Sequence, residues 1–281
     1  MNNNNNTKKN MKKIQSETNF LWKFVFHILL TPFTLILVLF KKKEWMDLLL
    51  PFKDFMVFIF EPKFTISIII LNFITFVASF FLSQELFNSF ISYPSDFLGA
   101  RAYTLLTSGF LHASWSHLLW NMLAIFIFGR VVERKLGFLK TNFIYFGSLF
   151  VSGIFSSLID LLRGSTVGGL GASGAIMGLV SAAILLDPFY IAHESGIPLP
   201  IMINGWLAIY ADLAGILNPT ADGIGHFAHL GGFISIGLLT FFLSGEDTEK
   251  LRKGLIINII SLLFGIAVYF LLESNVYSIL H

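Results

Sequence analysis

Three groups of polar residues in this apolar chain have types and spacings suited to hydrolysis. His117 and Asn121 lie four residues apart in LHASWSHLLWNML, so in a helix they share one face and can both donate hydrogen bonds to an oxyanion. Ser173 lies in STVGGLGASGAIMG, and a serine at a helix start has free backbone N–H groups beside its hydroxyl. His226 and His229 lie in GIGHFAHLGGF, where an imidazole can act as a general base.

Each group also has a structural interpretation, and the residues alone leave both open. His117 and Asn121 could form interhelical hydrogen bonds, and Gly174 with Gly178 could form a small-residue packing face. The segment GLGASG matches a dinucleotide-binding glycine pattern, but it lies between apolar stretches rather than in a βαβ unit. A soluble hydrolase elbow would need glycine where Ala175 stands.

The histidine pair could also belong to a metal site. His226 and His229 are three residues apart, but the sequence offers neither an HExxH motif nor an evident third ligand. We therefore expect no metal and no cofactor. Asp212 could be one member of an aspartyl site, which would need a second deep aspartate. We expect no aspartate to orient the histidine, so the prediction is a Ser–His dyad rather than a triad.

Composition predicts a polytopic membrane protein. Of the 281 residues, 55% are apolar and only 13% are charged, and the mean hydropathy is +0.74. Such a chain has too few polar side chains to cover a soluble globule of this size. It has no cysteine, which excludes thiol nucleophiles, thiolate zinc sites and a disulfide scaffold. The net charge of +2 is too small to suggest a nucleic-acid partner, and the expected surroundings are a lipid bilayer.

Hydropathy and loop charge predict how the chain crosses the bilayer. Lys and Arg gather in alternate loops, which we assign to the cytoplasm. Both ends of the first six spans then lie inside, and the three polar groups share one depth near the outer ends of spans. Glycines there would let helices approach until an imidazole nitrogen is about 3 Å from the Ser173 hydroxyl. The expected spans are 64–83, 115–130, 139–162, 172–187, 198–217, 225–243 and 254–272.

The predicted fold is all-α: a polytopic membrane helix bundle with a six-span core, one C-terminal span (6+1) and an N-terminal extension. Basic residues flank the stretch Phe20–Phe40 on both sides, which disfavours a span there and favours an interfacial or re-entrant segment. The expected divisions are a disordered polar head at 1–20, interfacial or re-entrant helices at 21–62, the six-span core at 63–245, and a linker with the seventh span at 246–281.

At these residues the sequence resembles the rhomboid family of intramembrane serine proteases. The resemblance runs through TSGFLHASWSHLLWNMLAIFIFGRVVERKLG, GASGAIMG and AHLGGF in the family's order, and covers roughly residues 60–245. It implies Ser173 as nucleophile, with its N–H also serving the oxyanion, and His229 as base, because the family pattern is Ala-His-x-x-Gly. It assigns the oxyanion to His117 and Asn121. The supporting residues that it implies are His112, Gly171, Gly174 and Met177.

Other positions have weaker or different matches. Glu133 and Gly137 match a structural feature of the family, and His226 has no family role and is expected to line the site or its loop. Tyr103 and Thr104 stand where the family commonly has Trp-Arg, which bears on the outer loop rather than on the chemistry. Met177 stands where the family often has an aromatic ring under the base, and it orients an imidazole less strictly.

The resemblance implies a serine endopeptidase that cleaves the transmembrane segments of single-span membrane proteins. We expect a multi-pass protein of a prokaryotic cell membrane, with the site open to the outer side. One alternative is an inactive relative that binds or escorts transmembrane clients, although such relatives commonly lack the Ser or the His. A transporter or channel is a second alternative, but it would need polar residues across the midplane, whereas here they gather on one side.

Overall fold

The computed structural model describes residues 24–192, 199–219 and 223–280, with side chains to residue 272. Within these ranges the chain is helical, and the only β pairing is two isolated bridges, which confirms the all-α prediction. The chain divides into two units, Met1–Glu61 and Pro62–His281. The predicted polar head at 1–20 lies outside the described residues.

The N-terminal unit is a helical hairpin whose contacts include a polar pair and an aromatic pair. His27 Nδ1 lies 3.0 Å from Asp54 Oδ2, and the rings of Phe24 and Phe55 stack with centroids 6.0 Å apart. Many of its apolar side chains are exposed, as expected of helices that contact lipid, and their interfacial or re-entrant placement stays a prediction. The helices are Phe24–Leu39, the 3-10 segment η1 (Trp45–Leu49) and α2 (Leu50–Phe60).

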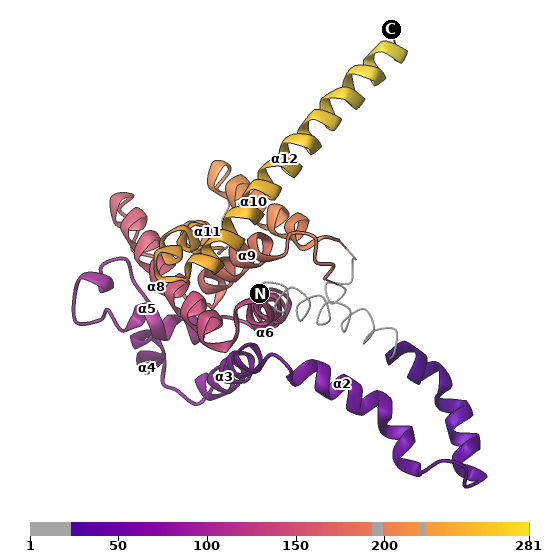
Figure 1. Cartoon of the computed structure of the whole chain (residues 1–281). Helices are drawn as coiled ribbons and strands as arrows, with labels where there is room; N and C mark the ends of the chain where they lie inside the picture. Colours follow the sequence, from indigo (N-terminus) through magenta and orange to yellow (C-terminus); the bar gives the residue numbers. More distant parts are fainter. Residues whose placement is uncertain (1–23, 193–198, 220–222, 281) are drawn as a thin grey trace. The chain divides into compact units, whose positions relative to one another are not determined.

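The second unit is a bundle in which every predicted span overlaps a helix (Figure 1). Among the described residues, three helices are long and apolar enough to cross a membrane: Trp115–Leu136, Phe138–Leu162 and Gly245–Leu272. The elements are α3 (Lys63–Ser79), α4 (Gln84–Ser89), η2 (Asp96–Leu98), α5 (Thr104–Thr107), η3 (Ser108–Phe110), α6 (Trp115–Ala124), η4 (Ile125–Gly129), α7 (Arg130–Leu136), α8 (Phe138–Leu162), α9 (Ser173–Leu186), α10 (Ile201–Leu217), α11 (His226–Leu239), η6 (Thr240–Phe242) and α12 (Gly245–Leu280).

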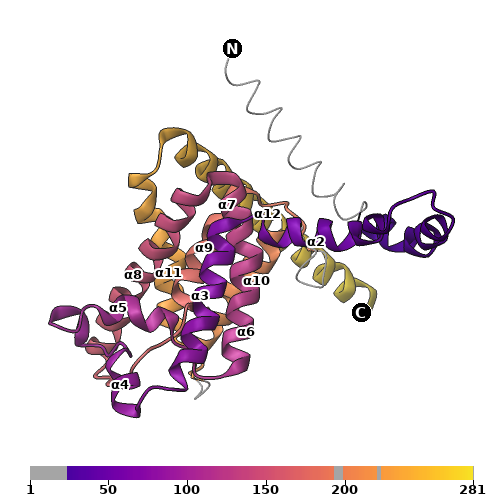
Figure 2. The same ribbon diagram turned by 90° about the horizontal axis from the view of Figure 1, so that it is seen from below.

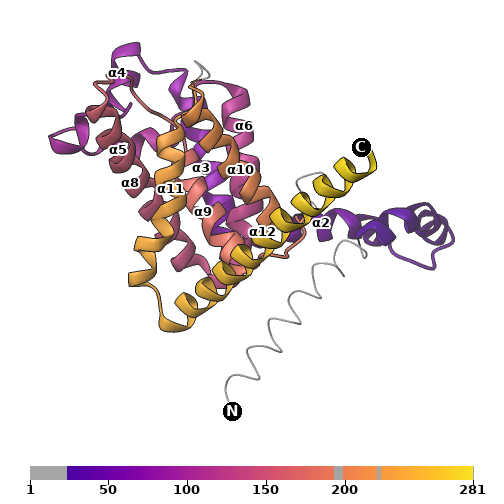
Figure 3. The same ribbon diagram turned by 90° about the horizontal axis from the view of Figure 1, so that it is seen from above.

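Helix α9 is the centre of the bundle. Each residue from Gly174 to Ile184 is buried, and α9 contacts α8, α10, α11 and α12 (Figures 2 and 3). Small residues permit this packing, because a Cβ at Gly174 would collide with Ser152 of α8, and one at Gly178 with Ser148 of α8. The small-residue face that the sequence suggested is therefore present.

Helices α9 and α11 touch backbone to backbone. A Cβ at Gly232 on α11 would collide with the carbonyl oxygen of Gly174 on α9. Beside this contact, Ser235 Oγ of α11 lies 2.7 Å from Ser148 Oγ of α8, so a pair of hydroxyls also joins α11 to α8. The contact fixes the start of α9 against the first turns of α11.

The second predicted span is longer than expected. Helix α6 continues through a π-helical segment, η4, into α7 without a break. In α7, the Glu133 carboxylate accepts hydrogen bonds from the Phe64 N–H at 2.8 Å and the Thr65 N–H at 2.9 Å. It thereby satisfies free donors at the start of α3. Gly137, with φ +85, then separates α7 from α8, a conformation that suits glycine.

The basic residues that marked one side of the bilayer gather at one end of the bundle. Lys135 pairs with Asp187, which follows α9, at 2.7 Å, and Lys140 of α8 pairs with Asp247 of α12. This agrees with their assignment to a single side, while the identity of that side as cytoplasmic stays a prediction.

Helix α12 begins at Gly245, so part of the predicted linker is helical. Its Asn258 side chain donates to the Ile184 carbonyl oxygen at 2.8 Å and accepts from Trp206 Nε1 at 2.9 Å. A Cβ at Gly254 would collide with the Leu185 carbonyl oxygen, so α12 also packs closely on the C-terminal half of α9.

The contact between α9 and α11 predicts a large difference between two glycines of α11. Gly232→Ala should lower the free energy of unfolding by about 1–3 kcal/mol, because the added methyl meets rigid backbone. Gly237→Ala is the matched control, since a Cβ there meets nothing within 4 Å and alanine favours helix. Thermal unfolding in detergent measures both, and equal melting temperatures would contradict the packing described here.

Candidate active site

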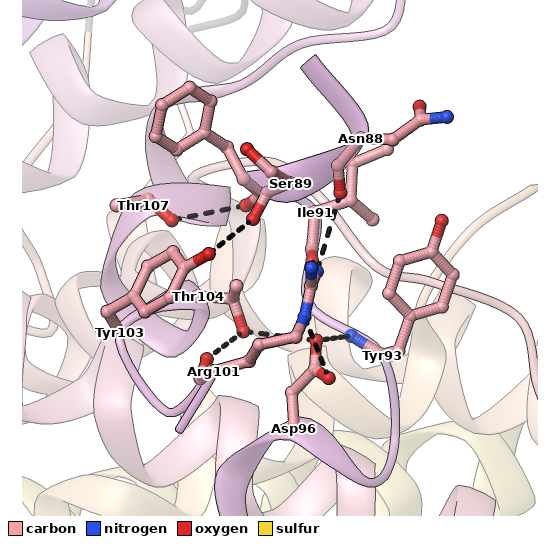
Figure 4. A network of polar contacts seen from close by, with 10 residues as sticks. Asn88, Ser89, Ile91, Tyr93, Asp96, Arg101, Tyr103, Thr104 and Thr107 are labelled. Atoms are coloured by element: carbon pink, nitrogen blue, oxygen red, sulfur yellow. Dashed lines mark hydrogen bonds and ion pairs between the residues drawn. The ribbon is translucent and has the colours of Figure 1, made fainter. Parts of the chain in front are cut away.

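The long loop before α6 is an ordered scaffold rather than a flexible connection. Arg101 Nε donates to the buried Asp96 carboxylate at 3.1 Å, and Arg101 Nη2 donates to the Ile91 carbonyl oxygen at 3.1 Å (Figure 4). Two residues that depart from the rhomboid pattern join this network. The Tyr103 hydroxyl donates to the Ser89 carbonyl oxygen at 3.0 Å, and the buried Thr104 hydroxyl donates within the loop (Figure 4).

This loop holds the glycine-rich segment that leads into α9. Ser92 and Gly169 exchange backbone hydrogen bonds of 3.2 and 2.7 Å, and the Gly171 N–H donates to the Ser108 carbonyl oxygen at 2.9 Å. Gly171 has φ +120, a backbone conformation that other residues rarely adopt. The chain is thus fixed on both sides of the turn that presents Ser173.

Ser173 is the first residue of α9 and is half-buried. At this position the backbone N–H groups of the first helical turn have no helical acceptor, so they can face a substrate oxygen. The next residue, Gly174, lies against α11, and a Cβ there would be 3.7 Å from the Ala228 carbonyl oxygen. Ser173 therefore lies at the level of the α11 turn that carries His229.

His117 and Asn121 face the same turn from α6. A Cβ at Gly171 would lie 2.8 Å from His117 Nε2 and 3.8 Å from Asn121 Nδ2. His117 Nδ1 accepts a long hydrogen bond, 3.5 Å, from the Ala113 N–H, which leaves the ring hydrogen on Nε2 as a donor toward Gly171. The buried Asn121 Nδ2 has no hydrogen-bond partner among the described residues. Two donors thus converge beside Gly171, two residues before Ser173, as an oxyanion site requires.

His112 lies directly behind His117. Its ring is buried, and the two imidazole centroids are 5.0 Å apart. Burial, together with the charge of His117, lowers the pKa of His112 to about 4, so His112 is neutral at physiological pH. It can pack against and orient His117 without adding charge to the site.

The prediction that no aspartate orients the histidine is wrong. Asp212 on α10 is buried, and its Oδ1 lies 2.8 Å from His229 Nδ1 on α11. The carboxylate holds the ring hydrogen on Nδ1 and leaves Nε2 as an acceptor, which is the tautomer that a general base needs. The carboxylate could not be paired from the sequence, because seventeen positions and a helix–loop–helix turn separate the two residues.

His226 shares the same carboxylate oxygen. His226 Nδ1 lies 2.9 Å from Asp212 Oδ1, so one oxygen contacts both imidazoles. The expectation that His226 lines the site is consistent with this position at the start of α11. The predicted support residue Met177 is buried in α9, and its Cβ would be 3.2 Å from a Cβ at Gly232.

The structure thus gathers the predicted residues around one turn but forms no hydrogen bond between the Ser173 hydroxyl and His229 among the described residues. Catalytic hydrogen bonds are often long without substrate and tighten in the complex. His117 and Asn121 approach the turn before Ser173 from α6, and His229 lies on α11, which packs against the start of α9.

Comparison with known proteins identifies the family. Residues 99–247 match the family model of the rhomboid domain. The rhomboid protease AarA of Providencia stuartii is 30% identical over 217 residues, which cover 67% of this chain and 74% of that protein. The rhomboid protease GlpG of Photorhabdus laumondii is 29% identical over 190 residues, covering 66% of this chain and 63% of that protein.

Plant proteins are also similar. The mitochondrial RHOMBOID-like protein 6 of Arabidopsis thaliana is 35% identical over 147 residues, which cover 52% of this chain. The match spans less than half of that protein's length, 45%. These relatives support a membrane protein. Because they come from a plant mitochondrion as well as from bacteria, the prokaryotic cell membrane stays a prediction. With its domain model, its bacterial relatives and its helical bundle in agreement, the chain belongs to the rhomboid family.

Proposed function

We propose that this chain is an intramembrane serine endopeptidase that cleaves transmembrane segments of single-span membrane proteins. The observation that carries the proposal is the 2.8 Å contact between Asp212 Oδ1 and His229 Nδ1. It leaves the other ring nitrogen of His229 as a proton acceptor, on the turn of α11 that packs against the start of α9. A histidine serving only to join helices would not need this tautomer.

The chemistry follows from the positions of the groups. His229 Nε2 takes the proton of the Ser173 hydroxyl, and Ser173 Oγ attacks the substrate carbonyl carbon. The negative oxygen that forms is held by His117 Nε2, Asn121 Nδ2 and the Ser173 N–H, each contributing about 3 kcal/mol. His229 then protonates the leaving amine, and water hydrolyses the acyl-enzyme. Asp212 stabilises the imidazolium formed in both steps.

A transmembrane substrate must unwind before it can react. Its carbonyl groups are hydrogen-bonded inside its own helix, and lipid offers no replacement partners. We expect cleavage near small residues in the outer part of a single-span segment, because such residues weaken the helix. The site's half-exposed serine and partly exposed base allow water to enter.

The competing function is that of an inactive rhomboid-like protein that binds or escorts transmembrane clients. It would account for the family and for the bundle, and it needs no proton acceptor beside Ser173. The presence of both Ser173 and His229, with a carboxylate on the base, favours the protease. Client binding by a chain that never cleaves would favour the alternative.

The nucleophile and the base have the clearest prediction. Ser173→Ala and His229→Ala should each abolish cleavage of a transmembrane substrate in liposomes while keeping the wild-type melting temperature. A fluorophosphonate should label the wild-type protein at Ser173. If His226→Ala abolishes cleavage while His229→Ala does not, the base has been assigned to the wrong histidine.

The oxyanion donors have a smaller predicted effect. Asn121→Ala should lower kcat by about 10²- to 10³-fold with little change in KM, because the donor acts on charge that develops during the reaction. Asn121→Asp is the matched control: it keeps the shape but replaces a donor with a negative charge, so it should be at least as damaging. Full activity in either variant would remove Asn121 from the site.

Asp212 is predicted to be a positioning residue. Asp212→Asn should lower kcat by up to about 10⁴-fold at unchanged KM, because an amide can hold the imidazole in the wrong tautomer. Asp212→Glu keeps the carboxylate and should recover part of the rate. Melting temperatures separate this effect from unfolding. If Asp212→Asn keeps the wild-type kcat, Asp212 does not contribute to catalysis and the site is a Ser–His dyad.

A further inference from the structure

We infer that Asp212, His226 and His229 form a binding site for Zn²⁺ or a similar divalent transition metal, and that a metal bound there switches the protease off. The site depends only on geometry, whereas the inhibition rests on the proposed function. In the sequence the two histidines lacked a third ligand. In the structure, α10 supplies it.

The three side chains bring together one ligand atom each. One nitrogen or oxygen from each residue lies within 4.8 Å of the others, and both Nδ1 atoms are within 2.9 Å of the same Asp212 oxygen. A tetrahedral zinc site with bonds of about 2.0–2.1 Å spaces its ligand atoms roughly 3.3 Å apart, so small side-chain movements suffice. Two imidazoles and one carboxylate leave a fourth position for water.

The surroundings hold the ligands in place while leaving access. His226 packs directly on α10, because a Cβ at Gly215 would collide with its ring. The Asp212 side chain is only 7% exposed, whereas those of His226 and His229 are 14% and 18% exposed. A buried carboxylate beside two partly exposed imidazoles allows an aqueous cation to enter and lose part of its hydration.

Metal binding would remove the base by changing its tautomer. In the free site each neutral imidazole carries its hydrogen on Nδ1, toward Asp212. A metal takes the Nδ1 lone pair, so that hydrogen moves to Nε2, and no proton is gained or lost overall. His229 Nε2 is then a donor and can no longer accept the Ser173 proton. The metal also replaces the contact by which Asp212 stabilises the imidazolium.

The binding test uses the full chain with Ser173→Ala, purified with a histidine-free tag in detergent. Isothermal titration with Zn²⁺ should give one site per chain, and adding His226→Ala should weaken binding by at least about tenfold, because one of three protein ligands is lost. Co²⁺ absorption reports the nitrogen ligands independently. His112→Ala is the matched control, since it removes a histidine that lies outside the cluster. Absent binding, or equal binding in His226→Ala, would overturn the site.

The inhibition test uses the active protein and the same transmembrane substrate. Zn²⁺ should stop cleavage, and a chelator should restore it. Relative to its own zinc-free rate, His226→Ala should need at least about tenfold more zinc than the wild type for the same fractional inhibition. Because the chain has no cysteine, His226→Cys offers one new thiolate, which should restore metal inhibition and shift preference toward Cd²⁺. Zinc that binds without inhibiting would refute the switch.

The two tests separate this inference from the proposed function. If Ser173→Ala binds zinc through His226 but the metal-free wild type never cleaves, the metal site stands and the protease proposal fails. If the wild type cleaves and zinc neither binds nor inhibits, the protease proposal stands and this inference fails.

Discussion

At Gly174 and Gly232 the backbones of α9 and α11 touch, and the position of every group in the candidate site follows from that contact. The first helix carries Ser173 at its start, and the second carries His229 one turn before the contact. Lipid gives helices no hydrophobic reason to associate, so close packing of small residues and buried hydroxyl contacts must hold them. A side chain at Gly232 would push α11 away from α9, and with it His229 away from Ser173.

The other elements around the site are attached to this centre by hydrogen bonds as well as by apolar packing. The Asp96–Arg101 loop fixes the turn before Ser173 through Gly169 and Gly171, and α6 brings two donors to the same turn. From the opposite side, α10 contributes a carboxylate. Polar groups of this kind are costly in a membrane unless they are paired, so their convergence is a functional signal as well as a structural one.

Much of this arrangement could be predicted from the sequence. Hydropathy located the long helices of the second unit but not the short α4 and α5, because only a stretch long enough to span the bilayer gives this signal. The spacing of His117 and Asn121 correctly predicted one shared helix face. Gly174 was correctly predicted to be a packing position, because small residues in membrane helices commonly mark the places where two helices approach closely.

The partner of His229 was not predictable in the same way. Asp212 was visible as an isolated acid in an apolar stretch, but whether it met His226, His229 or neither depended on how α10 returns to α11. Periodicity describes one helix at a time and contains no information on the rotation of two helices about each other. The boundary of α12 was missed for a simpler reason: charged residues at its start were interpreted as a linker, although they form ion pairs within the helix.

The π-helical turn η4 divides the helix Trp115–Leu136 into an N-terminal half with His117 and a C-terminal half with Glu133. A π-helical turn accommodates an extra residue and so sets the angular phase between the two halves. Removing one residue from Ile125–Gly129 would turn one half by about 100° relative to the other. His117 and Asn121 would then turn away from Gly171, while Glu133 kept its hydrogen bonds to the start of α3. This short π-helical segment therefore sets the rotation of one half of the helix relative to the other.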